Sequence, residues 1–234
     1  MSSSAAHVVL VHGAWADGSS WSKVIALLQA KGIDAVAVQL PLTTLSGDVA
    51  TVKRAIALQD GPVVLAGHSY GGAVITEAGN DPKVAGLVYV AAFAPGDGES
   101  VGSVGKDYPP APLGAELRPD AEGFLSISPK GFAESFAQDL PAKEIRVLWA
   151  TQGPTNAAVF GATISKAAWK TKPSWFVVAD DDRAIPPALE KAEAERLKAT
   201  TISLAASHLV MISHPKEVAD LIAKAATSVT QRRA

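Results

Sequence analysis

The sequence predicts an α/β fold: a mostly parallel, doubly wound sheet of about six strands, with an inserted and mainly helical cap. Two observations predict it. Short, almost wholly apolar runs alternate along the chain with amphipathic stretches at helical spacing, as expected for parallel strands buried between layers of helices. This alternation stops after residue 94 and resumes at about residue 173, which indicates an insertion between two parts of one sheet.

The part of the chain before the insertion alternates strands and helices. Apolar runs that end at a glycine or proline mark the strands, and apolar residues three or four positions apart mark the helices. Gly32 follows the first helix as a residue suited to a left-handed cap, and Asp48 lies near the start of the second. The expected strands are 7–11, 34–40, 63–66 and 84–92, and the expected helices are 20–31, 47–58 and the stretch after Ser69.

The insertion is expected to cap the sheet and to turn its inner face toward a substrate. Glycine and proline are frequent near its beginning, and most of its large apolar residues fall at roughly helical spacing; the run 145–150 alone is typical of a strand. We assign residues 95–172 to this cap, and residues 1–94 and 173–234 to the core of the same single domain. The core then continues with strands at 175–179 and 200–205 and with helices at 187–198 and 215–226.

Composition narrows the classes of partner. A hydrophobic content of 48% over 234 residues argues for one well-packed domain, and the net charge of −2 gives no basic surface for nucleic acid. The absence of cysteine excludes disulfides, a thiol nucleophile and thiolate metal sites. Neither a secretory signal nor an apolar stretch long enough to span a bilayer is visible. We therefore expect a cytoplasmic protein that binds small molecules and not membranes, and a homodimer remains an open option.

The most informative stretch is 62–74, which reads PVVLAGHSYGGAV. An apolar run passes within a few residues into a helix-compatible sequence, so strand and helix backbones must come close together. Gly67 and Gly71 permit this approach because neither has a Cβ atom. Ser69 would then stand at the carboxyl edge of the sheet, beside the free N–H groups of the following helix. These features predict a nucleophilic serine.

Four loops with polar residues follow the ends of the predicted strands. In a parallel sheet covered by helices, the carboxyl ends of the strands share one edge, and ligands bind there. We therefore expect the four loops to meet. They contain His12-Gly13-Ala14 after the first strand, Ser69 after the third, Asp180-Asp181-Asp182 after the strand that follows the insertion, and Ser207-His208 after the last.

A serine hydroxyl needs partners before it attacks a carbonyl group. A base must take its proton, and a third group must orient that base and stabilise its cation. We assign Ser69 as the nucleophile, His208 as the base and Asp182 as the acid. The alternatives are His214 as the base, although it precedes a proline where it would suit a helix cap, and the other two residues of the acidic run 180–182 as the acid.

The sequence segments VLVHGAW, GHSYGG, DDRAIPP and SHLVMISHP, with the chain order Ser69, Asp182, His208, resemble the α/β-hydrolase superfamily over essentially the whole chain. The resemblance is greatest to its small, cap-bearing branch of plant methylesterases, hydroxynitrile lyases and bacterial esterases. It implies a serine esterase that needs no cofactor and no metal. It also implies an oxyanion hole made by the backbone N–H groups of Ala14 and Tyr70, and it places the catalytic acid at Asp182.

Departures from the family pattern bear on the reaction. The lyases of this branch have a threonine after the first-strand histidine and a lysine after the catalytic histidine, where this chain has Gly13 and Leu209. The methylesterases have a second histidine where this chain has Asp17 and Gly18. We therefore expect hydrolysis of small to medium apolar carboxylic esters through an acyl-enzyme. The alternatives are lyase or cofactor-free perhydrolase chemistry on the same fold, or a small-ligand binding protein with a vestigial site.

Overall fold

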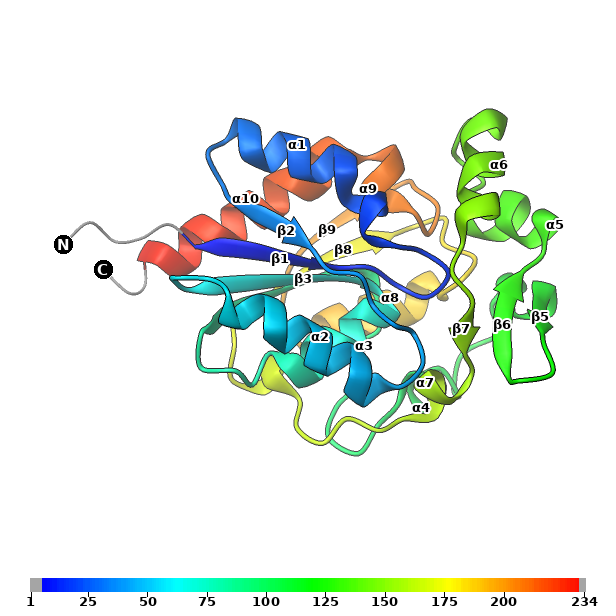
Figure 1. The fold of residues 1–234 in the computed structure, drawn as a ribbon, viewed down its shortest axis with the longest axis horizontal. Helices are drawn as coiled ribbons and strands as arrows, with labels where there is room; N and C mark the ends of the chain where they lie inside the picture. Colours follow the sequence, from blue (N-terminus) through cyan, green and yellow to red (C-terminus); the bar gives the residue numbers. More distant parts are fainter. Residues whose placement is uncertain (1–5, 232–234) are drawn as a thin grey trace.

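A computed structural model describes residues 6–231 of the chain, and its central feature is a sheet of six parallel strands (Figure 1). Their order across the sheet is β2-β1-β3-β4-β8-β9, so the chain starts near one edge, crosses the sheet and finishes at the other. The predicted parallel sheet is confirmed. Its strands are β1 (His7–Val11), β2 (Ala35–Ala37), β3 (Val63–Ser69), β4 (Val84–Ala92), β8 (Ser174–Ala179) and β9 (Thr200–Leu204).

The central strands are buried on both faces, which explains their continuous apolar character. Every residue of β3 and β8 is buried. The edge strand β2 is shorter than the predicted 34–40, because the chain leaves the sheet after Ala37. There the backbone N–H of Leu40 donates to the ring of His12 at 2.9 Å instead of to a strand neighbour.

Helices cover both faces of the sheet, as predicted (Figure 1). On one face, α1 (Ser22–Ala30) packs beside α10 (Pro215–Gln231), which runs five residues beyond its predicted end. On the other face lie α2 (Leu45–Ala57), α3 (Tyr70–Ala78) and α8 (Pro187–Arg196). Gly32 has a φ of 71°, the left-handed conformation expected of a cap after α1.

Most of the inserted segment lies beyond the carboxyl ends of the strands, at the right of Figure 1. Its last residues run back to the end of α3, where Asn80 donates to the carbonyl oxygen of Lys166 at 2.7 Å. Besides short helices the segment contains a three-stranded antiparallel sheet that the sequence did not indicate, because its strands are only two to four residues long. The sheet comprises β5 (Leu117–Pro119), β6 (Phe124–Ile127) and β7 (Thr155–Asn156). The helices of the segment are α4 (Val101–Val104), α5 (Pro129–Gly131), α6 (Ala142–Thr151) and α7 (Ala158–Gly161), and Phe132–Phe136 forms a π-helical turn.

The strand predicted at 145–150 is wrong, because these residues belong to helix α6. Ile145 and Leu148, three positions apart, pack against the core, whereas Val147 is 58% exposed. This burial follows the helical period and not the alternation of a strand.

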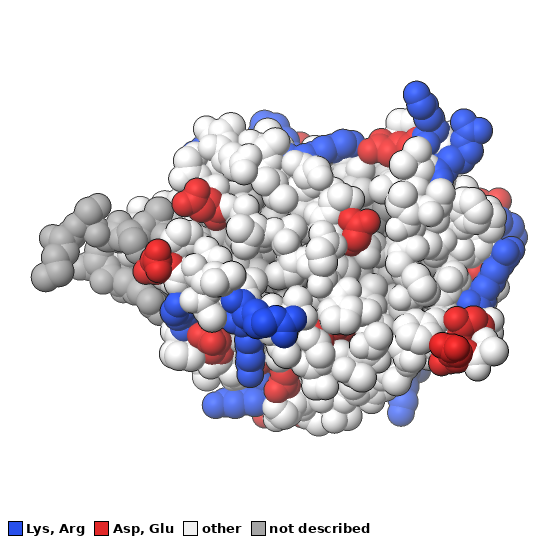
Figure 2. All heavy atoms as spheres, in the orientation of Figure 1, with Lys and Arg blue, Asp and Glu red and all other residues white. Residues whose placement is uncertain are grey.

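Acidic and basic side chains are interspersed on the face shown in Figure 2. No helix in the described part of the chain combines the length and the apolar character needed to cross a bilayer.

Candidate active site

Ser69 lies in a tight turn between β3 and α3, where the sequence predicted it. Its φ of 54° and ψ of −124° are unusual for a residue with a side chain and cost about 1–3 kcal/mol. Close packing holds the turn in this shape. A Cβ atom at Gly67 would lie 2.5 Å from the carbonyl oxygen of Gly71, and one at Gly71 would lie 2.6 Å from that of Val11. The two glycines are therefore required for the turn.

The structure brings His208 and Asp182 together. His208 Nδ1 lies 2.5 Å from Asp182 Oδ2, and both side chains are buried. The other carboxylate oxygen, Asp182 Oδ1, accepts hydrogen bonds from the backbone N–H groups of Ala184 at 2.6 Å and Ile185 at 2.9 Å. These contacts fix the carboxylate, and they assign the proton of neutral His208 to Nδ1. The Nε2 atom of His208 is then free to accept a proton.

The alternatives considered from the sequence lie elsewhere. Asp180 and Asp181 are exposed, and Asp180 pairs with Lys191 at 2.7 Å on the surface. The Nδ1 atom of His214 contacts the hydroxyl of Ser213 at 2.9 Å, just before α10 begins. Of the predicted candidates, Asp182 and His208 thus form the buried pair.

His68 connects the Ser69 turn to the His208 loop. Its Nε2 atom is 2.9 Å from the carbonyl oxygen of His208, and the two rings are 4.6 Å apart between centroids. Burial, and then the neighbouring His208, lower the pKa of His68 well below its ordinary value, so the ring is neutral and its Nε2–H donates. Among residues 6–231 no hydrogen bond joins the Ser69 hydroxyl to His208.

The loop after β1 packs directly against the Ser69 turn. His12 fastens this loop, since its Nε2 atom accepts from the N–H of Leu40 and its Nδ1–H donates to the carbonyl oxygen of Gly13 at 2.8 Å. Burial lowers the pKa of His12 and so favours this neutral form. A Cβ atom at Gly13 would lie 2.6 Å from Ser69 Cβ. His12 and His68 thus orient these loops by hydrogen bonds.

The predicted oxyanion donors are the backbone N–H groups of Tyr70, which follows Ser69 directly, and of Ala14, which follows Gly13 in the loop packed against Ser69. Tyr70 is the first residue of α3, so its N–H has no partner within the helix. Within residues 6–231, neither N–H donates a hydrogen bond to another protein group. Both are therefore available to bind an oxygen atom.

Asp48 is a supporting residue that the sequence did not reveal. It was expected near the start of a helix, but it is fully buried, and its carboxylate accepts from the Tyr70 hydroxyl at 2.8 Å and from the N–H of Leu42 at 2.9 Å. Burial raises the pKa of Asp48, and the hydrogen bond from Tyr70 opposes that rise. Asp48 thereby anchors the side chain of the residue that follows Ser69.

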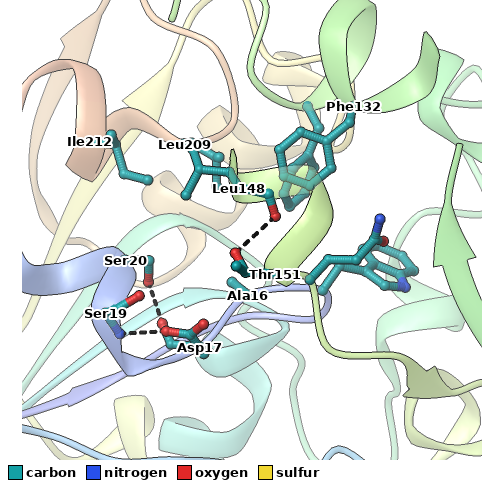
Figure 3. Close-up of a pocket in the computed structure, with 12 residues that line it drawn as sticks. Ala16, Asp17, Ser19, Ser20, Phe132, Leu148, Thr151, Leu209 and Ile212 are labelled. Atoms are coloured by element: carbon teal, nitrogen blue, oxygen red, sulfur yellow. Dashed lines mark hydrogen bonds between the residues drawn. The ribbon is translucent and has the colours of Figure 1, made fainter. Parts of the chain in front are cut away.

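A narrow cavity lies next to the loop that carries His208: Leu209 lines it, whereas Ser69 and His208 are not among its lining residues (Figure 3). Its empty space, including the mouth, is about 300 Å³. Leu209 and Ile212 line it from the core, while Phe132 and Leu148 line it from the inserted segment. Phe136, another lining residue, packs 5.1 Å from the His208 ring. This side of the cavity is therefore largely apolar.

Polar groups lie on another side of the same cavity. Asp17 accepts a hydrogen bond from the N–H of Ser19 at 2.6 Å, and its carbonyl oxygen accepts from the hydroxyl of Ser20 at 2.7 Å (Figure 3). In the described part of the chain, no three His, Asp or Glu side chains cluster in a way that could hold a metal ion.

Comparison with known proteins agrees with this architecture. The family model described as "Alpha/beta hydrolase family" matches residues 8–221. The chain is 27% identical over 243 residues to the probable hydrolase R7 of a Phoma species, covering 94% of this chain and 97% of that protein. It is 25% identical over 260 residues to esterase PIR7B of Oryza sativa subsp. japonica, covering 96% of this chain and 97% of that protein.

Among solved structures, a pyrethroid hydrolase from Sphingobium faniae JZ-2 matches with a TM-score of 0.83 at 24% identity, covering 96% of this chain and 98% of that one. This likeness shows the shared fold. The family model spans nearly the whole chain, including the Ser69 turn and the Asp182–His208 pair. The chain therefore belongs to the alpha/beta hydrolase family.

Proposed function

We propose that this protein is a serine hydrolase that cleaves carboxylic esters of small to medium apolar substrates through an acyl-enzyme intermediate. The main support is the buried pair of His208 and Asp182 on the same sheet edge as Ser69. Ser69 itself occupies a strained turn between β3 and α3. The rice relative is named an esterase, which favours esters among the substrates of the family.

The reaction begins with His208 Nε2 taking the proton of the Ser69 hydroxyl as its oxygen attacks the ester carbonyl. The carbonyl oxygen becomes an oxyanion and binds to the N–H groups of Ala14 and Tyr70, which strengthen their hydrogen bonds as charge develops. Asp182 holds the Nδ1–H tautomer and stabilises the imidazolium. The intermediate then collapses, and the leaving alcohol takes the proton from His208.

The second half of the reaction regenerates the enzyme. His208 removes a proton from water, whose oxygen attacks the acyl group on Ser69. Collapse of the second oxyanion breaks the bond to Ser69, which recovers its proton from His208, and the carboxylic acid leaves. No cofactor or metal takes part in these steps. A protonated His208 cannot act as base, so we expect the rate to fall toward acidic pH.

The lining of the cavity next to the His208 loop favours the proposal of apolar substrates. Phe132, Leu148 and Leu209 would exclude water from an alkyl or aryl group placed there, and burial of that group would supply binding energy. Gly13 and Leu209 argue against the lyase alternative, because neither residue supplies a hydroxyl or a cation that could stabilise a departing cyanide anion.

The deciding experiment compares Ser69→Ala with Ser46→Ala, an exposed serine on α2 that serves as a matched control. Ser69→Ala should abolish hydrolysis of p-nitrophenyl esters and labelling by a fluorophosphonate probe, while remaining folded by circular dichroism. Ser46→Ala should retain both. Turnover by Ser69→Ala at the original rate would remove Ser69 from the nucleophile role.

Two further assays address the alternative functions. Cyanohydrin cleavage or peracid formation faster than ester hydrolysis would favour lyase or perhydrolase chemistry on this fold. A folded protein that neither labels with the probe nor turns over any ester of a panel varied in acyl and alcohol size would favour a binding protein.

A further inference from the structure

Glu190 is a buried carboxyl group that the proposed mechanism does not use. It lies in the first turns of α8 and is 0% exposed, although glutamate is seldom fully buried without a partner. Its Oε2 atom accepts a hydrogen bond at 3.0 Å from the N–H of Ala179, the last residue of β8. Its Oε1 atom is buried, and no donor of the described residues reaches it. Oε2 of Glu190 therefore has a hydrogen-bond donor, and Oε1 has none among the described residues.

The neighbour of this carboxyl group is Asp182. Both residues are buried, Glu190 at 0% and Asp182 at 5% exposure. Ala179 anchors both residues, because its carbonyl oxygen also accepts from the N–H of Asp182 at 3.2 Å. Two ionised carboxylates buried beside the same backbone residue repel and offer each other no donor, whereas a proton on one of them removes the repulsion and supplies a donor.

The number of donors decides which carboxyl group holds the proton. The Asp182 carboxylate receives three hydrogen bonds, from the His208 ring and from the backbone of Ala184 and Ile185. Glu190 receives one, from Ala179. Donors stabilise the ionised form, so the negative charge belongs on Asp182 and the proton on Glu190.

We propose that Glu190 is held protonated behind Asp182 and donates a hydrogen bond from Oε1 to the Asp182 carboxylate. Glu190 touches neither substrate nor reacting atoms, so it is a positioning residue: it holds Asp182 in the orientation that presents Oδ2 to His208. The kinetic consequence rests on the proposed function, whereas the location of the proton does not.

The electrostatic surroundings agree with a neutral Glu190. Burial, and then the charge of Asp182, raise the pKa of Glu190 well above its ordinary value. Glu193, one turn further along α8, adds to this rise. The nearest cation on the helix, Lys191, is directed to the surface, where it pairs with Asp180 at 2.7 Å. No cation of the described residues pairs with Glu190 to stabilise its ionised form.

The first test locates the proton by infrared spectroscopy. It is performed in a Glu193→Gln background, because Glu193 is the other buried carboxyl of α8 and would add a similar band. At neutral pH this protein should show the C=O stretch of a protonated carboxylic acid, and the further substitution Glu190→Gln should remove that band. A spectrum that does not change on Glu190→Gln would overturn the proposal.

The second test separates donation from mere filling of space. Glu190→Gln keeps an N–H donor for Asp182 and an oxygen for Ala179, so kcat should stay close to that of the unmodified enzyme. Glu190→Leu keeps neither and should lower kcat by about tenfold to a hundredfold, the loss expected for one hydrogen bond to a charged group, with KM little changed. Equal loss in both variants would show a structural role only.

The pH profile gives a third readout that does not need Glu190→Leu to fold. In the unmodified enzyme kcat should fall at alkaline pH, where Glu190 ionises against Asp182; Glu190→Gln should lack this fall and Glu193→Gln should retain it. An alkaline fall that persists in Glu190→Gln would contradict the proposal. Failure of the ester-hydrolase function would appear separately, as turnover retained by Ser69→Ala with the infrared result unchanged.

Discussion

Asp139, a residue of the inserted segment, accepts two hydrogen bonds from Ser207, one from its backbone N–H at 2.9 Å and one from its hydroxyl at 2.5 Å. Ser207 directly precedes His208. The neighbouring Gln138 donates from its amide to the carbonyl oxygen of Asp181 at 2.7 Å, next to Asp182. The inserted segment therefore holds both loops that carry the buried pair, so it is part of the support of the site.

We expect Asp139→Ala to lower kcat for a p-nitrophenyl ester by about tenfold, because it removes both hydrogen bonds that hold the His208 loop. Burial opposes ionisation of Asp139, but the hydrogen bonds from Ser207 lower its pKa overall, so the group that is lost is a carboxylate at neutral pH. Asp60→Ala, on an exposed loop, is the control. A kcat equal to that of the control would show that the loop is held by other contacts.

The contact between Gly13 and Ser69 gives a second prediction. Gly13→Ala places a Cβ atom where Ser69 Cβ already lies 2.6 Å away, so the turn or the loop that carries Ala14 must move. We expect kcat to fall by about a hundredfold or more, comparable to the loss of an oxyanion donor elsewhere. Fluorophosphonate labelling of Ser69 should slow in parallel.

The matched control for this substitution is Gly114→Ala. A Cβ atom there would meet nothing within 4 Å, so the same chemical change should leave kcat and the melting temperature unchanged. If Gly13→Ala retained full activity, close packing of this loop against Ser69 would have no part in the reaction.

The Ser69 turn was predictable from sequence because its determinants are local. An apolar strand, two glycines and a serine within residues 63–71 dictate a single path for the backbone, and the structure follows it. Strand β4 is similar: the predicted 84–92 and the observed Val84–Ala92 agree, since a strand buried on both faces is apolar almost throughout.

The supporting residues were not predictable, because their contacts join distant parts of the chain. Asp48 and Glu190 both lie in the first turn of a helix, where an acidic residue ordinarily interacts with the helix dipole at the surface. Nothing in the sequence shows that one meets Tyr70 and the other lies behind Asp182. The wrong prediction of a strand at 145–150 has a local cause. The run is short, and its apolar residues alone do not distinguish a strand from a helix.

A third prediction concerns the cavity next to the His208 loop. Leu148 lies between Leu209 and Phe132 in Figure 3, and its truncation would widen the cavity without touching Ser69. We expect Leu148→Ala to raise kcat/KM for bulky acyl esters relative to the acetate by several-fold to about tenfold, the scale of a few methylene groups. Leu58→Ala, at a residue that is 82% exposed, should not alter this ratio. An unchanged ratio in Leu148→Ala would place the acyl group elsewhere.

Glu193 provides a prediction for stability instead of activity. Its side chain is 2% exposed, neither carboxyl oxygen has a well-formed hydrogen bond to a described residue, and Arg196 Nη2 lies 3.6 Å from Oε1. Burial outweighs the opposing effects of the Ala94 backbone and of this cation, and it raises the pKa of Glu193 to about 8. The folded state therefore binds this proton more tightly than the unfolded chain does.

The sign of the pH effect follows from proton linkage. Below the ordinary pKa of a glutamate, Glu193 is protonated in both the folded and the unfolded state, so its burial does not lower the free energy of unfolding. As the pH rises toward 8, the unfolded chain releases this proton while the folded protein keeps it, so the free energy of unfolding falls. Glu193→Gln removes this loss and should be more stable than the unmodified protein at pH 8.5 by up to a few kcal/mol, with a smaller difference at pH 5. Urea denaturation at both pH values measures the two free energies. A difference that does not grow with pH would mean that Glu193 is ionised in the folded state, with Arg196 and not burial controlling its charge.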